Sequence, residues 1–155
     1  MTVRVQREDF DLGEEVRRMT VGRVDVGAVA TFTGVCRGVT GDATIGAMTL
    51  ETYEAMAVAE LERIAADARG RWPLQDLLVV HRYGRMEPGD NIVLVVALSE
   101  HRQAAFAAAE YVMDFLKTKA PFWKFEDRPD GGGWVAAKDA DDEATERWAA
   151  PSART

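Results

Sequence analysis

The sequence has few of the residues that form disulfides and metal sites. Its 155 residues include one cysteine, Cys36, and two histidines, His81 and His101. A single thiol cannot form an internal disulfide, and these three residues lack the spacing of metal ligands. We therefore expect no disulfide framework and no metal, and the lone thiol fits a reducing compartment.

Positive charge and long apolar runs are also scarce. The formal net charge is −7 at pH 7, which argues against the basic face of a nucleic-acid-binding protein. No apolar run approaches the roughly 20 residues that cross a bilayer. The N-terminal stretch MTVRVQREDFDLGEE lacks the apolar segment of a signal peptide. We expect a cytoplasmic protein that binds neither nucleic acid nor membrane.

The hydrophobic pattern predicts one α+β domain over residues 1–155, with a core at about 3–138 followed by a short polar helix and tail at 139–155. Several predicted strands are joined by turns too short for parallel crossovers, so the sheet should be mostly antiparallel. Residues 38–46 should form a loop. The predicted strands are 3–5, 27–37, 45–53, 77–83, 91–98, 122–126 and 134–137, and the predicted helices are 11–18, 56–72, 99–119 and 141–148.

Two helix starts have recognisable caps. Asp11 and Ser99 are residues that accept hydrogen bonds from free amides at an N-cap. If Ser99 caps the long helix, His101 and Arg102 lie in its first turn, where free amides and two cationic side chains would form an anion site. The similar pair His81-Arg82 lies within a predicted strand, where a structural role is favoured.

Lysine is confined to one short region. It stands at positions 117, 119, 124 and 138, whereas the other cations are arginine, and a lysine pKa can move into the range of proton transfer. In an extended PFWKFE segment, Lys124 and Glu126 share one face and Phe125 takes the other. Aromatic neighbours would lower the pKa of Lys124 and Glu126 would raise it, so the direction stays open. A helix dipole alone accounts for Lys119.

Arg37 ends a predicted strand at the mouth of the glycine-rich loop. The loop spacing is neither a Walker nor a Rossmann pattern. Cys36 could carry sulfur as a nucleophile, but in a β-branched strand a small buried apolar residue is the favoured interpretation. Converging cations in an acidic chain indicate a small anionic substrate. The candidate set is Arg37, His101, Arg102, Lys117 and Lys124.

Several stretches resemble one known family, in the family's order, from about Gly27 to Lys138. They are AVATFTGVCR, MTLETYEAMA, RWPLQDLLVVHRYGRMEPGD, SEHRQAAFAAAEYVMDFLKTKAPFWKFE and GGWVAAK. The most specific part is the block His101-Arg102-x3-Phe106 followed by LKT-x-APFWK. On these residues the chain resembles the large, catalytic subunit of molybdopterin synthase.

The resemblance implies an α/β hammerhead fold, no cofactor, and a homodimer at the centre of a heterotetramer. It implies a small ubiquitin-like partner whose C-terminal Gly-Gly tail carries sulfur as a thiocarboxylate. The substrate would be cyclic pyranopterin monophosphate, which receives two sulfur atoms to become the molybdopterin dithiolene. The substrate pocket, where the tail ends, can draw on both large subunits.

Matching positions carry roles over from the family. Lys117 and Lys124 would be catalytic, handling protons and stabilising an oxyanion, while Arg37, His101 and Arg102 would hold the phosphate and pterin. The full substrate-binding set is Val35, Cys36, Arg37, His101, Arg102, Lys117, Lys124, Phe125 and Glu126.

Two positions depart from the family pattern. Cys36 is not a family signature and is assigned no catalytic role. Lys138 stands where an arginine is common, so a substrate contact there stays open. Two rival functions also stay open: a non-catalytic docking module for a ubiquitin-like tail or a phosphopterin, and a sulfurtransferase that carries a persulfide on Cys36.

Overall fold

Two strongly apolar strands, β6 (Leu74–Arg82) and β8 (Asn91–Ser99), pair antiparallel at the centre of the main sheet. The computed structural model describes residues 1–41, 43–128, 131–135 and 139–149. On the outer sides of the central pair lie β1 (Thr2–Gln6), parallel to β6, and β2 (Ala28–Val35), antiparallel to β8. The strand order is therefore β1-β6-β8-β2, so β6 and β8 each pair with a strand on both sides.

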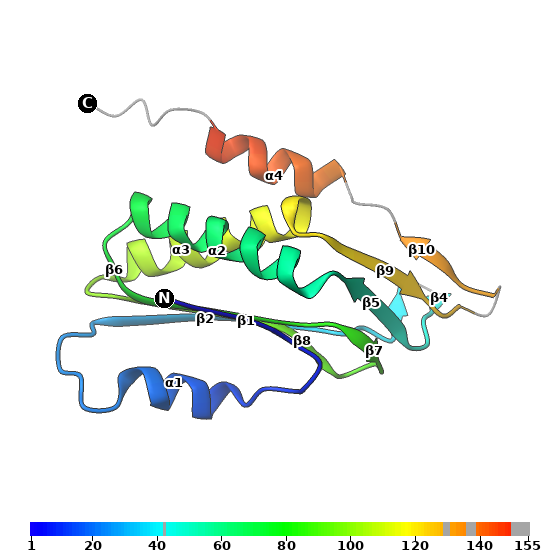
Figure 1. The fold of residues 1–155 in the computed structure, drawn as a ribbon, viewed down its shortest axis with the longest axis horizontal. Coiled ribbons are helices and arrows are strands. Elements are labelled where there is room, and N and C mark those ends of the chain that lie inside the picture. Colours follow the sequence, from blue (N-terminus) through cyan, green and yellow to red (C-terminus); the bar gives the residue numbers. More distant parts are fainter. Residues whose placement is uncertain (42, 129–130, 136–138, 150–155) are drawn as a thin grey trace.

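Helices cover both faces of the main sheet (Figure 1). Helices α2 (Glu54–Arg71) and α3 (Arg102–Lys119) pack on one face, and α1 (Leu12–Thr20) packs on the other. Strands buried on both faces need apolar residues at successive positions, which explains the unbroken runs in β6 and β8. Leu77, Val79, Val93 and Val95 face α2 and α3, while the residues between them face α1.

A second sheet lies at one end of the molecule (Figure 1). Its order is β10 (Gly133–Val135), β9 (Phe122–Glu126), β5 (Met48–Thr52) and β7 (Gly84–Met86), and every pairing in it is antiparallel. Only the β1–β6 pairing is parallel among the described strands. The prediction of an α+β domain with mostly antiparallel sheets is therefore confirmed.

The helix starts gave one correct and one wrong prediction. Asp11 is the N-cap of α1, and its carboxylate accepts a hydrogen bond from the Glu14 amide at 2.9 Å. Ser99 does not cap α3. It is the last residue of β8, paired with Ala28, and its buried hydroxyl donates to the Pro73 carbonyl. Sheet pairing thus extends the strand through Ser99, and α3 starts at Arg102 after His101 as N-cap.

Two further departures from prediction are local. The expected loop 38–46 contains a hairpin of β3 (Val39–Thr40) and β4 (Ala43–Thr44), and β7 was not predicted.

The last helix, α4 (Asp139–Ala149), packs over α3 (Figure 1). Its Trp148 contacts the rings of Trp72 and Tyr111 edge to face, and the indole N–H donates to Asp114 at 2.6 Å. In the described residues, no helix combines the length and apolarity that spanning a membrane requires.

Two glycines provide a matched test of backbone packing. A Cβ on Gly27 would lie 1.9 Å from the Glu100 carbonyl oxygen, whereas a Cβ on Gly70, in α2, meets nothing within 4 Å. Gly27→Ala should lower the free energy of unfolding by about 1–3 kcal/mol, because the β2 start must shift away from that carbonyl. Gly70→Ala should raise it by about 0.5 kcal/mol through lower chain entropy. Urea denaturation measures both, and equal effects would contradict this packing.

Candidate active site

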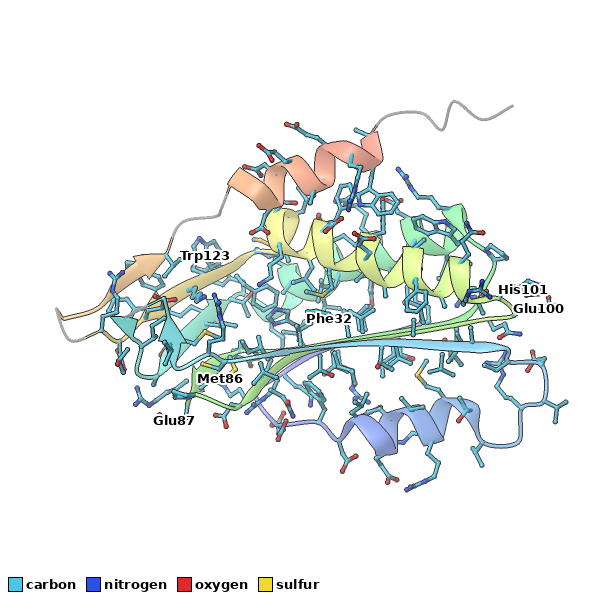
Figure 2. The ribbon with its side chains drawn as sticks, turned by 180° about the vertical axis from the view of Figure 1, so that it is seen from behind. Phe32, Met86, Glu87, Glu100, His101 and Trp123 are labelled. Carbon is cyan, nitrogen blue, oxygen red and sulfur yellow. The ribbon has the colours of Figure 1, made fainter. Side chains whose placement is uncertain are left out.

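One cavity of about 550 Å³ lies where the main sheet, the second sheet and the end of α3 meet. The end of β2 supplies one wall, with Phe32 lying between the sheet and α3 (Figure 2). The walls carry three of the five predicted cations, Arg37, Lys117 and Lys124. Two acidic side chains, Glu126 and Asp141, also line the cavity.

Strand β9 places alternate side chains in the cavity, as the sequence predicted. Phe122, Lys124 and Glu126 line the cavity, while Phe125 lies on the other face against Trp134, with ring centroids 5.4 Å apart. The Lys124 Nζ lies 3.3 Å from Glu126 Oε1, and this carboxylate is mostly buried. The pair holds the ammonium in place with one strong ion contact. Phe125, predicted to bind substrate, does not line this cavity.

Lys117 approaches the cavity from a different element. It lies in the last turn of α3, where the helix dipole favours a cation, and its side chain lines the cavity. Lys119 lies in the same turn but not in the cavity wall. Arg37 follows β2 at the cavity's rim, and no described acidic side chain pairs with it. Helix, strand and loop thus each contribute one cation.

Cys36 is in the cavity wall but is almost fully enclosed. Its side chain is 4% exposed and packs with Met48, Leu50 and Met86, and Sγ lies 4.0 Å from the Met86 carbonyl oxygen. Burial raises the pKa of the thiol, with Lys124 acting in the opposite direction. The prediction that Cys36 is a small buried apolar residue is confirmed. Its neighbour Val35 is exposed and also lines the cavity.

His101 and Arg102 lie away from this cavity. Figure 2 shows His101 and Glu100 at one end of the main sheet, and Met86 and Glu87 at the other end, where the cavity is. Neither His101 nor Arg102 lines the cavity, both are exposed, and the nearest acidic contact of His101 is Glu100 at 3.8 Å. The structure therefore does not bring the five predicted cations together within one chain. Lys138 lies outside the described residues.

His81 lines the cavity, although the sequence analysis favoured a structural role for it. Its ring is buried and stacks on Phe122, with centroids 3.9 Å apart and planes 19° apart. Burial lowers the pKa of His81 to about 4, and the charge of Lys117 acts in the same direction. The available signal was a histidine inside an otherwise continuous apolar run. Among the described residues, no group of three or more His, Cys, Asp or Glu side chains could hold a metal ion.

Comparisons with known proteins agree on one family. The sequence profile of the MoaE protein family matches residues 5–119. The molybdopterin synthase catalytic subunit of Mesorhizobium japonicum is 57% identical over 153 residues, which are 97% of this chain and 95% of that protein. The solved MoaE protein from Burkholderia ambifaria is 47% identical, covers 96% of this chain and 98% of its own, and superposes with a TM-score of 0.81.

A more distant solved structure shares the fold. It is the protein–protein complex of subunits 1 and 2 of the molybdopterin-converting factor from Helicobacter pylori. The likeness has a TM-score of 0.69 at 21% sequence identity, and it covers 88% of this chain and 90% of that chain.

The burial of Cys36 predicts a poorly reactive thiol. Because only the thiolate attacks, and burial both raises the thiol pKa and blocks access, a maleimide should label the folded protein at least about 100-fold more slowly than the urea-unfolded chain. Stopped-flow or mass-spectrometric labelling measures both rates. Comparable rates would support the persulfide-carrier alternative instead.

Proposed function

Because the chain belongs to the MoaE protein family, we propose that the cavity is the active site of a molybdopterin synthase catalytic subunit. The enzyme transfers sulfur in the formation of molybdopterin. Its substrate is cyclic pyranopterin monophosphate, and its sulfur source is the thiocarboxylated C-terminus of a small ubiquitin-like subunit. The reaction takes place in the cytoplasm, where a lone thiol stays reduced.

The observation that carries this proposal is the arrangement of Arg37, Lys117 and Lys124 around one cavity. The chain as a whole has a formal charge of −7, whereas the three cations outnumber the carboxylates Glu126 and Asp141 in the cavity wall. Its volume of about 550 Å³ lies within the roughly 300–1,000 Å³ of small-molecule sites. A compact phosphorylated ring compound fits both the charge and the size.

The two lysines can serve both steps of the reaction. The thiocarboxylate sulfur first adds to a carbonyl carbon of the pterin precursor; the C=O π bond breaks, its electron pair goes to oxygen, and that oxygen takes up a proton. The carrier's acyl group is then left on sulfur as a thioester. Water then attacks the acyl carbon, the carbon–sulfur bond breaks, and a carboxylate and a substrate-bound thiolate result. The tetrahedral intermediate carries an oxyanion, which a neighbouring ammonium stabilises. Lys117 and Lys124 provide that charge and exchange the protons that each step releases or takes up.

The sulfur donor is a second protein. In the related Helicobacter pylori structure, two subunits of a molybdopterin-converting factor form a complex, and we extend this pairing to the present chain. The carrier's C-terminal Gly-Gly tail would enter the cavity, since glycine residues without side chains allow a close approach of backbone to the reacting groups.

The positions of His101 and Arg102 support a homodimer. His101 lies at the end of the main sheet opposite the cavity (Figure 2), Arg102 follows it as the first residue of α3, and both side chains are exposed. If they bind the substrate's phosphate, they must reach a cavity in a second copy of the chain. A two-fold dimer makes this contact twice, once for each active site. The complete assembly is then a heterotetramer of two catalytic subunits and two carriers.

The alternative function is a docking module that binds the carrier tail or a phosphopterin without turnover. The lysine pair favours the enzyme, because binding of an anion alone is served equally well by arginine, whose pKa is too high for proton transfer.

Substitution of Lys117 tests the catalytic assignment. Lys117→Ala should lower turnover at least about 100-fold, because the cavity loses a group for proton transfer and oxyanion stabilisation. Binding of the carrier should remain nearly unchanged. The assay mixes the chain with thiocarboxylated carrier and cyclic pyranopterin monophosphate and detects the fluorescent oxidised pterin. Lys119→Ala, in the same helix turn but outside the cavity wall, is the matched control and should keep full activity.

The two-chain site makes a separate prediction. A heterodimer of one Lys117→Ala chain and one His101→Ala chain, isolated through two different affinity tags, contains one intact composite site and one doubly defective site. It should therefore retain about half of the wild-type rate per dimer, while each variant homodimer is nearly inactive. A heterodimer with no activity would place His101 and Lys117 in the same chain's site.

A further inference from the structure

His81 is a buried polar residue that the reaction described above does not use. It lies near the end of β6, opposite Val93 of β8 and Val5 of β1. Along β6, Leu77, Val79 and His81 point to the face covered by α2 and α3. The first two fill the apolar core, whereas His81 comes where the core ends and the cavity begins.

Two contacts fix the His81 ring. Nδ1 lies 2.8 Å from the Arg82 carbonyl oxygen. A carbonyl oxygen can only accept, so Nδ1 carries the proton of the neutral ring and Nε2 is left as an acceptor. Phe122 stacks on the ring at 3.9 Å and prevents rotation out of this plane. The tautomer and the ring orientation are therefore both determined.

The remaining nitrogen, Nε2, is directed into the cavity. Nδ1 is bonded to the backbone of its own strand, so the opposite edge of the ring points away from the strand. Nε2 has no hydrogen-bond partner among the described residues. It is also not one of the described side-chain atoms that lack a partner and are fully closed off from solvent, so it is open to the cavity. A buried acceptor without a protein partner is costly unless water or a ligand completes it.

The ring is also uncharged at neutral pH. Its pKa of about 4 follows first from burial and then from the positive charge of Lys117. The cations in the wall, Arg37, Lys117 and Lys124, can only donate while they are protonated. The wall also holds two carboxylates, of which Glu126 is engaged by Lys124 and Asp141 is a further acceptor, and the Thr33 hydroxyl, which can both donate and accept. His81 thus adds an uncharged nitrogen acceptor to a wall whose other acceptors are two carboxylates and one hydroxyl.

We propose that His81 is a substrate-recognition residue whose Nε2 accepts a hydrogen bond from a ring N–H of the reduced pterin. The inference rests on the proposed function, since it concerns the same cavity. The cations recognise the phosphate, and His81 recognises the ring system. A carboxylate in its place would repel the anionic substrate, while a neutral imidazole accepts the same hydrogen without that cost.

A pair of substitutions tests the acceptor. His81→Phe keeps a ring against Phe122 and removes both nitrogens, so the dissociation constant for cyclic pyranopterin monophosphate should rise about tenfold, the usual worth of one hydrogen bond. KM should rise in parallel and kcat should change much less. His81→Gln extends an amide to the region of Nε2 and should recover most of the affinity. Calorimetric titration of the catalytic subunit measures binding without the carrier.

Val79→Ala is the matched control for packing. Val79 lies two positions earlier on the same face of β6, is fully buried and does not line the cavity. Its truncation should lower the free energy of unfolding and leave the dissociation constant unchanged. If it weakens binding as much as His81→Phe does, the effect of His81 is one of packing and the proposal is wrong.

The remaining outcomes separate this inference from the proposed function. Equal affinity of His81→Phe and a wild-type chain that turns substrate over would overturn the role of His81 alone. A wild-type chain that neither binds the pterin nor forms product would overturn both. If His81→Phe does not fold, His81→Asn replaces it, because its amide keeps a donor near the Arg82 carbonyl and is too short to reach the position of Nε2.

Discussion

The geometry of the cavity depends on the junction between α3 and β9. Pro121 disfavours a helical residue before it, and Ala120 is extended, with φ −71° and ψ 136°. The helix therefore stops at Lys119 and the chain continues directly into a strand. The Thr52 hydroxyl donates to the Pro121 carbonyl at 2.7 Å and ties the junction to β5. Because the chain turns so sharply, the last helical turn and the first strand residues border one cavity, which brings Lys117 and Lys124 to it from different elements.

The same junction places the aromatic ring that orients His81. Phe122 is the first residue of β9, and its ring stacks on the imidazole of His81 from β6 of the main sheet. A shift of β9 by one residue would turn Phe122, Lys124 and Glu126 to the outer face and expose the ring of His81. Pairing of β9 with β5 from Phe122 to Glu126 prevents this shift. Sheet register, rather than any single contact at the lysines, thus maintains the arrangement of side chains in the cavity.

The parts that the sequence predicted are those decided by near neighbours in the chain. The alternation of Phe122, Lys124 and Glu126 follows from strand geometry, and Asp11 caps α1 through a hydrogen bond three residues away. The Ser99 cap was wrong because pairing with β2 decided the end of β8. His81 borders the cavity because three elements of the fold meet there, and hydrophobic periodicity along the sequence cannot predict where elements meet. The charge pattern had already selected Arg37, Lys117 and Lys124, the family resemblance added their roles, and the fold explains why they converge.

The residues proposed to bind the substrate lie at opposite ends of the main sheet. Arg37 and the two lysines border the cavity of their own chain. His101 lies at the other end of the main sheet (Figure 2), and Arg102 follows it as the first residue of α3. In the proposed dimer, one chain supplies the groups that carry out chemistry and recognise the ring, while the other supplies additional positive charge for the phosphate. Phosphate binding then depends on the dimer, and ring recognition does not. An isolated chain would retain His81 and the lysines correctly placed and would still bind the substrate weakly.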